Sequence, residues 1–166
     1  FAAIYLFPEY HTLMLSASGE MDFPDTLSQY FSVLHMLARG LAMVEPAVLN
    51  SPHDPNLYSS VIVFILIPLY IMCKKVDFRE KLGKVLLLGL LLISFNLNIP
   101  NFIWHGFHFP NSLPCRESFI FIFLALSMSY DAQHYIGSFE RKQLMGTICG
   151  VFALFMIIEE FMLADE

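Results

Sequence analysis

The stretch Asn98–Ser118 concentrates the side chains best suited to chemistry, with the only Trp of the chain, two His, three Pro and one Arg. The planar guanidinium of Arg116 matches the geometry of phosphate oxygens. The imidazoles of His105 and His108 can take up or release a proton near neutral pH. A zinc site would need further ligands at matched positions. The stretch therefore predicts hydrogen bonding, proton transfer or phosphate binding, without a metal or another cofactor.

Each of these residues also has a simpler interpretation. Trp104 could stack on a sugar ring, or it could only anchor the chain at the membrane interface, where Trp is common. Arg116 could hold a specific phosphate group, or it could reach the headgroups of bulk phospholipid. The residue types alone leave both pairs of alternatives open.

The composition places these residues in a membrane protein. Hydrophobic residues make up 57% of the chain and charged residues 14%, against about 45–50% and 25% in soluble domains. The mean hydropathy is +0.61. A soluble domain of 166 residues needs more polar surface to cover its core. Because 9 Lys and Arg face 15 Asp and Glu, nucleic acid is not an expected partner.

The apolar stretches predict an all-α fold, a polytopic bundle of transmembrane helices. Each stretch is about 18–20 residues long, enough to cross a hydrocarbon layer of ~30 Å as a helix. The third could instead be a buried helix, and Pro68 should kink the first. The predicted spans are Asn56–Cys73, Leu82–Ile99, Ser118–Tyr135 and Leu144–Leu163. They form the part 56–163, with an outer loop at 100–117, after an outer segment 1–55.

The distribution of basic residues predicts the orientation. Five of the nine Lys and Arg lie in 74–84, and Arg141 and Lys142 lie between the third and fourth spans. Positively charged loops stay in the cytoplasm. The segments 16–55 and 100–117, with one Arg each, should therefore face outward.

The outer segment contains an amphipathic pattern over Asp25–Glu45. Apolar residues recur there at helical spacing, and Asp25 suits an N-cap. We expect a helix at the outer membrane interface. It could either cap the bundle or line a site, and it carries Arg39, the second outer cation.

The ends of the chain predict an internal fragment of a longer membrane protein. It begins with Phe1, without the charged region of a signal peptide. The three Cys residues support no disulfide, because Cys115 has no partner in an outer loop.

The run NFIWHGFHFPNSLPCRESFIFIFL, Asn101–Leu124, resembles the signature of the YfhO family of bacterial multi-span membrane proteins. The stretches LARGLAMVEPAV, DPNLYSSVIVFILIPLYIM and LGKVLLLGLLLISFNLNI are similar to that family too. The resemblance covers most of 37–130. Proteins of this family resemble the GT-C glycosyltransferases, so the resemblance implies that the chain is a fragment of a larger GT-C-like membrane protein.

The resemblance implies a glycosyltransferase on the outer face of the bacterial cytoplasmic membrane. Its partners would be membrane lipid, a polyprenyl-phosphate-linked sugar as donor and a cell-wall polymer such as teichoic acid as acceptor. The residues expected to bind the substrates are Arg116 and Arg39 at the carrier phosphate, His105, His108 and Asn101 at the sugar or acceptor, and Trp104 stacked on the sugar. The catalytic base is expected outside this chain, with Glu45 and Asp54 as alternatives. Glu117 stands beside Arg116 and could pair with it.

Two other functions fit the same residues. Transporter sites lie near the bilayer midplane beside broken helices, and Pro68, Ser94 and Asn96 are the residues that point that way. A transporter or flippase of lipid-linked intermediates is therefore one alternative. A non-catalytic membrane scaffold is the other.

Overall fold

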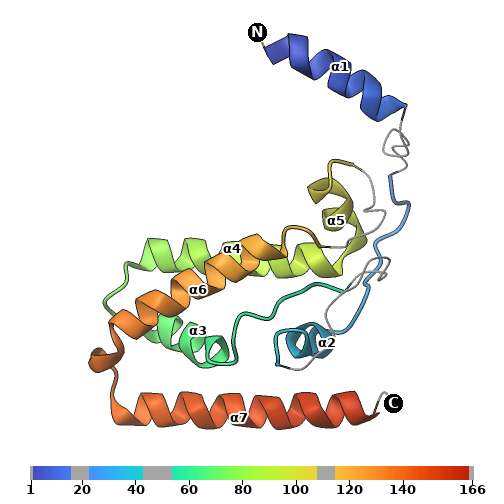
Figure 1. Cartoon of the computed structure of the whole chain (residues 1–166). Coiled ribbons are helices and arrows are strands. Elements are labelled where there is room, and N and C mark those ends of the chain that lie inside the picture. Colours follow the sequence, from blue (N-terminus) through green and yellow to red (C-terminus); the bar gives the residue numbers. More distant parts are fainter. Residues whose placement is uncertain (1, 16–22, 43–53, 108–114, 165–166) are drawn as a thin grey trace.

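A computed structural model describes residues 2–15, 23–42, 54–107 and 115–164 of the chain (Figure 1). Within them the chain is helical, with no strand beyond an isolated bridge between Gln29 and Leu97, which confirms the predicted all-α class. The α-helices are α1 (Ala2–Met14), α2 (Val33–Ala38), α3 (Val63–Met72), α4 (Phe78–Asn96), α5 (Asn98–Trp104), α6 (Ser118–His134) and α7 (Arg141–Ala164), and a 3₁₀ turn covers Ile136–Ser138.

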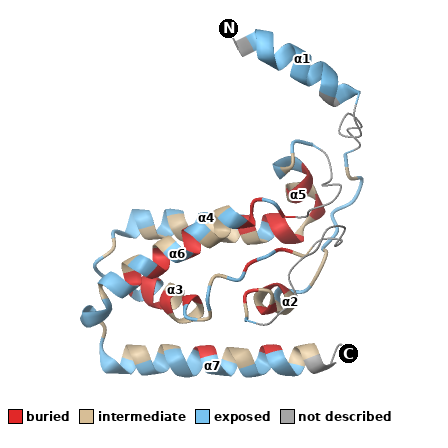
Figure 2. Ribbon diagram, in the orientation of Figure 1, coloured by how far each residue is buried: buried red, intermediate tan, exposed pale blue. Residues whose placement is uncertain are grey.

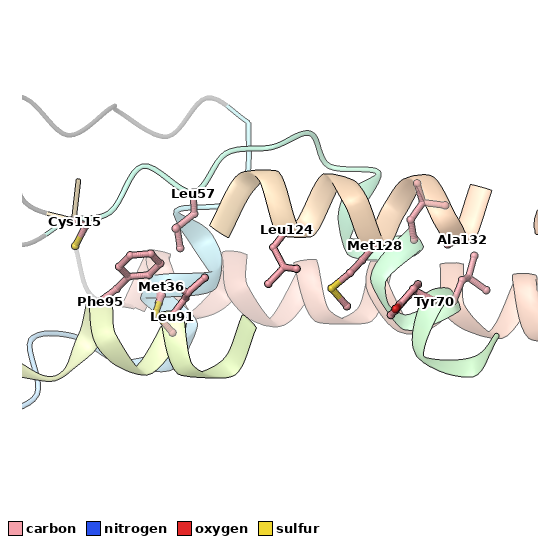
Figure 3. Packing of buried hydrophobic residues seen from close by; sticks show 11 residues of the cluster. Met36, Leu57, Tyr70, Leu91, Phe95, Cys115, Leu124, Met128 and Ala132 are labelled. Atoms are coloured by element: carbon pink, nitrogen blue, oxygen red, sulfur yellow. The ribbon is translucent and has the colours of Figure 1, made fainter. Parts of the chain in front are cut away.

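Helices α3, α4 and α6 enclose the core (Figure 3). Tyr70 from α3, Leu91 and Phe95 from α4, and Met128 and Ala132 from α6 are all fully buried. Lys84 of α4 lies at the end of the core nearest the α3–α4 turn. It forms ion pairs of 2.7 Å with Glu80 and with Asp131 of α6. Apolar packing and one polar link therefore fix α4 against α6.

Helix α7 packs on α2 and α3 but leaves most of its surface exposed (Figure 2). The ring of Phe155 meets Phe64 edge to face, with centroids 5.3 Å apart. A cavity of about 680 Å³, mostly apolar, lies between α7 and the helices α2, α3 and α4. Phe152 on α7, Leu86 on α4 and Phe123 on α6 are all exposed. Such apolar surface is typical of a protein that faces lipid or further apolar chain.

One helix of the described part is long and apolar enough to cross a membrane, over Arg141–Met162. It coincides with the fourth expected span. Helix α6 matches the third expected span closely with 17 residues. Helix α4 begins before the second span at its N-cap Asp77, whose carboxylate accepts from Arg79 N at 2.9 Å.

Two expected helices are shorter than predicted. The first span was expected to begin at Asn56, but residues 54–62 are not helical. Helix α3 has only 10 residues, and Pro68 is one of them. The predicted helix Asp25–Glu45 is wrong at its start, because Ser32 caps α2 by accepting from His35 N at 3.1 Å. Residues 43–53, with Glu45, lie outside the described residues.

The helices place their connections at two opposite ends (Figure 1). The α3–α4 turn and residues 135–140, drawn at the left, lie at one end. Helices α2 and α5 and residues 115–117 lie at the other end. Arg39 and Arg116 belong to this second end, where the predicted site residues gather.

Candidate functional site

Two asparagines at the break between α4 and α5 hold the extended segment 26–31. The backbone N–H of Tyr30 donates to the backbone carbonyl of Asn96 at 2.9 Å. The N–H of Phe31 donates to the side-chain oxygen of Asn96 at 3.1 Å. The side-chain oxygen of Asn98 accepts from Ser28 N at 2.9 Å, and its amide nitrogen donates to Thr26 O at 2.8 Å. These bonds keep Tyr30 beside α5. Asn96, interpreted from the sequence as a hint of a transporter, here has a structural role.

Helix α5 carries Asn101 and ends just before His105. Asn101 is fully buried, and its side-chain amide lies beside the Tyr30 hydroxyl. His105 Nδ1 lies 2.9 Å from the backbone carbonyl of Asn101. Because a carbonyl oxygen can only accept, Nδ1 must carry a hydrogen. That hydrogen leaves Nε2 as the atom of the ring that can gain or lose a proton.

Glu117 lies opposite this nitrogen, at the N-cap of α6. Its Oε2 is 3.4 Å from His105 Nε2, and the two side chains are only 5% and 7% exposed. The site therefore holds a buried histidine–carboxylate pair between two segments that are 12 positions apart in the sequence. Sequence reasoning missed this pair, because no periodicity links residues on either side of an irregular loop.

Burial governs the ionisation of the groups around the pair. It raises the pKa of the Glu117 carboxyl, although the nearby His105 ring and the backbone N–H of Glu117 act in the opposite direction. It also raises the pKa of the Tyr30 hydroxyl, against the effect of the neighbouring Asn101 amide. Burial, with the charges of Glu117 and Asp54, raises the pKa of the Cys115 thiol to about 12. Tyr30 and Cys115 therefore stay neutral at physiological pH.

Arg116 is exposed, unlike Cys115 and Glu117 on either side of it, which are buried. Among the described residues no ion pair or hydrogen bond engages its guanidinium. The expected pairing of Glu117 with Arg116 is not observed, because Glu117 turns inward to His105. The positive charge of Arg116 is therefore not compensated by its neighbour.

A second polar group lies around α2. His35 Nε2 is 3.2 Å from Asp54 Oδ1, and about a third of each side chain is exposed. Arg39 caps α2 and donates from Nε to the carbonyl of Pro55 at 3.2 Å. Because the charge of Asp54 affects the Cys115 thiol, this group adjoins the His105–Glu117 pair.

Trp104 and His108 are the other residues that the sequence predicted for the site. Trp104 is exposed at the end of α5. Helix α5 ends at Trp104, and the chain then takes positive φ at Gly106 and Phe107, so the helix does not continue past His105. His108 itself lies outside the described residues. In the described part no group of three or more His, Cys, Asp or Glu could hold a metal ion.

The comparison with known proteins identifies the family. Residues 1–164 match the family model described as "Bacterial membrane protein YfhO". No curated protein and no solved structure matches the chain. The match covers nearly the whole sequence and includes both the exposed arginine and the buried pair. The chain therefore belongs to the YfhO family of bacterial membrane proteins.

Proposed function

We propose that the chain is part of a multi-pass glycosyltransferase of the bacterial cytoplasmic membrane. It would move a sugar from a polyprenyl-phosphate carrier to a cell-wall polymer, such as teichoic acid, on the outer face. One observation carries this proposal: Arg116 is exposed and uncompensated among the described residues, beside a cluster of hydrogen-bonding side chains. An exposed guanidinium suits the carrier phosphate.

The exposed and partly exposed residues at this end suit the steps of such a transfer. The acceptor oxygen would bond to the anomeric carbon while the bond from that carbon to the phosphate oxygen breaks. Asp54, held by His35 at 3.2 Å, would take the proton of the acceptor hydroxyl. Arg116 would stabilise the charge on the departing polyprenyl phosphate. Trp104 would stack on the sugar, and Arg39 would assist at the phosphate.

The proposal gives two residues roles that differ from those expected from the sequence. Asn101 and His105 are both largely buried, so the proposal assigns them to the support of the site rather than to direct contact with the sugar. His108 keeps its expected role at the sugar or acceptor as part of the proposal.

The test uses the full-length protein in membranes with a radiolabelled polyprenyl-phosphate sugar. Transfer of label into cell-wall polymer should fall about 100-fold in Arg116→Ala, with the amount of protein in the membrane unchanged. Arg79→Ala, an exposed arginine at the opposite end, is the matched control and should keep wild-type transfer. Equal transfer by wild type and Arg116→Ala would refute the role of Arg116.

A transporter or flippase of lipid-linked intermediates is the second candidate. The apolar cavity between α3 and α7 favours it, because the cavity is lined by Pro68 and by Gly146 and Gly150, and its walls suit a lipid chain. Movement of the labelled carrier across vesicles, without transfer of its sugar, would support this function over the transferase.

A further inference from the structure

Residues 105 and 117 are anchored at the two ends of one loop. Before the loop, Phe107 N donates to Phe102 O at 3.0 Å, and after it both the amide and the hydroxyl of Ser118 donate to Cys115 O. The contact of 3.4 Å between His105 Nε2 and Glu117 Oε2 joins these two ends. Both side chains are more than nine-tenths buried, so the contact is shielded from solvent.

The hydrogen bond to Asn101 fixes how many protons this contact can hold. Since His105 Nδ1 already donates to the Asn101 carbonyl, the contact between Nε2 and Oε2 has room for one proton. At 3.4 Å the two atoms are within ion-pair distance, and neither has a hydrogen-bond partner among the described residues. That proton resides either on the imidazole, which gives an ion pair, or on the carboxyl, which gives a neutral pair. In both forms the pair has no net charge, so its burial is tolerated.

The same contact decides what Arg116 can bind. A free Glu117 carboxylate would be the nearest anion in sequence to the Arg116 guanidinium and would compete with any phosphate. We propose that the His105–Glu117 pair is a one-proton clasp that keeps Glu117 away from Arg116 and so positions Arg116 to bind a phosphate group. This inference rests on the proposed function, in which that phosphate belongs to the polyprenyl carrier. His105 and Glu117 are positioning residues, because they act through Arg116.

The clasp should open when its proton is lost. Without that proton, the lone pair of Nε2 faces the negatively charged carboxylate of Glu117, and the two repel each other. Glu117 is then an anion beside Arg116. The other ionisable groups at this place are Tyr30, Cys115, and Asp54 with its partner His35. Burial raises the pKa values of Tyr30 and Cys115, so both remain protonated in this pH range. Phosphate binding should therefore weaken as the pH rises.

The experiment measures binding of radiolabelled polyprenyl phosphate to the full-length protein in phosphatidylcholine nanodiscs, between about pH 6 and about pH 9. The wild-type Kd should rise about tenfold across this range. Glu117→Gln should not show this rise, because the neutral Gln amide can donate to a bare Nε2 or accept from a protonated one and never becomes an anion beside Arg116. Glu140→Gln removes an exposed carboxylate at the opposite end and should keep the wild-type profile. The same rise in Glu117→Gln as in wild type would overturn the clasp.

A second measurement needs no bound phosphate. In protein labelled with [15N]histidine, the His105 signals, identified by their loss in His105→Gln, should show a protonated Nδ1 throughout and an Nε2 whose proton is lost at the pH where the Kd rises. A wild type with the expected His105 signals but no phosphate binding would refute the proposed function and the positioning of Arg116, while the clasp itself would stand. An Nε2 that does not titrate in this range would refute the clasp, whatever the protein binds.

Discussion

Asn98 shows how one side chain can hold a whole segment in place. Its oxygen accepts from Ser28 N and Ile99 N, and its nitrogen donates to Thr26 O. Asn98→Ala would leave these backbone groups without their partners, at a cost of about 2–3 kcal/mol. We expect a lower midpoint of thermal unfolding, followed by the fluorescence of Trp104, the only Trp of the chain. Gln133→Ala, at an exposed position on α6, should leave the midpoint unchanged, and an equal shift in both variants would refute this role.

Cys115 should react slowly with maleimides. Burial raises the pKa of its thiol to about 12, and the thiolate is the reactive form. In a protein with Cys73→Ala and Cys149→Ala, the reaction rate of Cys115 should therefore still increase about tenfold per pH unit at about pH 9.5. An ordinary thiol has a pKa of about 8.5 and reaches a plateau there. The control is a protein in which Cys115 is also replaced by Ala and Phe107→Cys, at an exposed position, supplies an ordinary thiol. A plateau in the rate of Cys115 would contradict the prediction.

The sequence allowed prediction of part of the candidate site. The concentration of Trp, His and Arg singled out 98–118, and the structure places Asn101 and His105 side by side there. Glu117 was considered only as a neighbour of Arg116. The sequence shows which residues are adjacent along the chain, but it does not show which residues meet in the fold. Its contact with His105 depends on where the loop ends meet. At the two ends of the loop the backbone takes positive φ at Gly106, Phe107 and Cys115, which the residue types at the last two do not indicate.

Gly40, two residues after the end of α2, lies close to the Phe64 side chain of α3. A Cβ at this position would lie 2.9 Å from Cζ of Phe64 and 3.3 Å from the carbonyl of Leu37. Gly40→Ala should therefore destabilise the fold by about 1–2 kcal/mol, measured as a lower midpoint of thermal unfolding. Adding Phe64→Leu should recover part of the loss, since it removes the nearest ring atom.

Gly83 supplies the matched control for this contact. It lies in α4, and nothing comes within 4 Å of a Cβ built on it. Gly83→Ala should leave stability unchanged or raise it by up to about 1 kcal/mol, because Ala favours helix. A loss of stability similar to that of Gly40→Ala would show that the close approach at Gly40 is not the cause.

The lengths of the helices were predictable only where hydropathy decides them. Helices α6 and α7 follow long apolar runs, and the structure has them near the expected bounds. The segment 25–45 has the same apolar spacing, yet its first part is extended. There the backbone groups are satisfied by Asn96 and Asn98 instead of by a helix. A periodic pattern records which residues can be buried, but it does not show a hydrogen-bonding partner about 70 residues away.

At the scale of the molecule, the two ends differ in charge. Lys74, Lys75, Arg79, Lys81 and Lys84 gather at the start of α4 and just before it, and Arg141 and Lys142 begin α7 at the same end (Figure 1). The other two basic residues, Arg39 and Arg116, belong to the opposite end with the buried pair. The positive-inside rule was applied to loops of the sequence, and the fold brings those loops together in space.

This arrangement predicts that the end with Arg116 faces outward while the basic end faces the cytoplasm. Two single cysteines test it in a full-length protein without other cysteines: Phe107→Cys near the buried pair and Ser138→Cys between α6 and α7, both at exposed positions. In intact cells a membrane-impermeant maleimide should label the first and not the second, and both should react once the membrane is made permeable. Labelling of Ser138→Cys alone would reverse the orientation. It would also place Arg116 on the cytoplasmic side, where a sugar carrier displayed outside could not reach it, so the same result would refute the proposed transfer at the outer face.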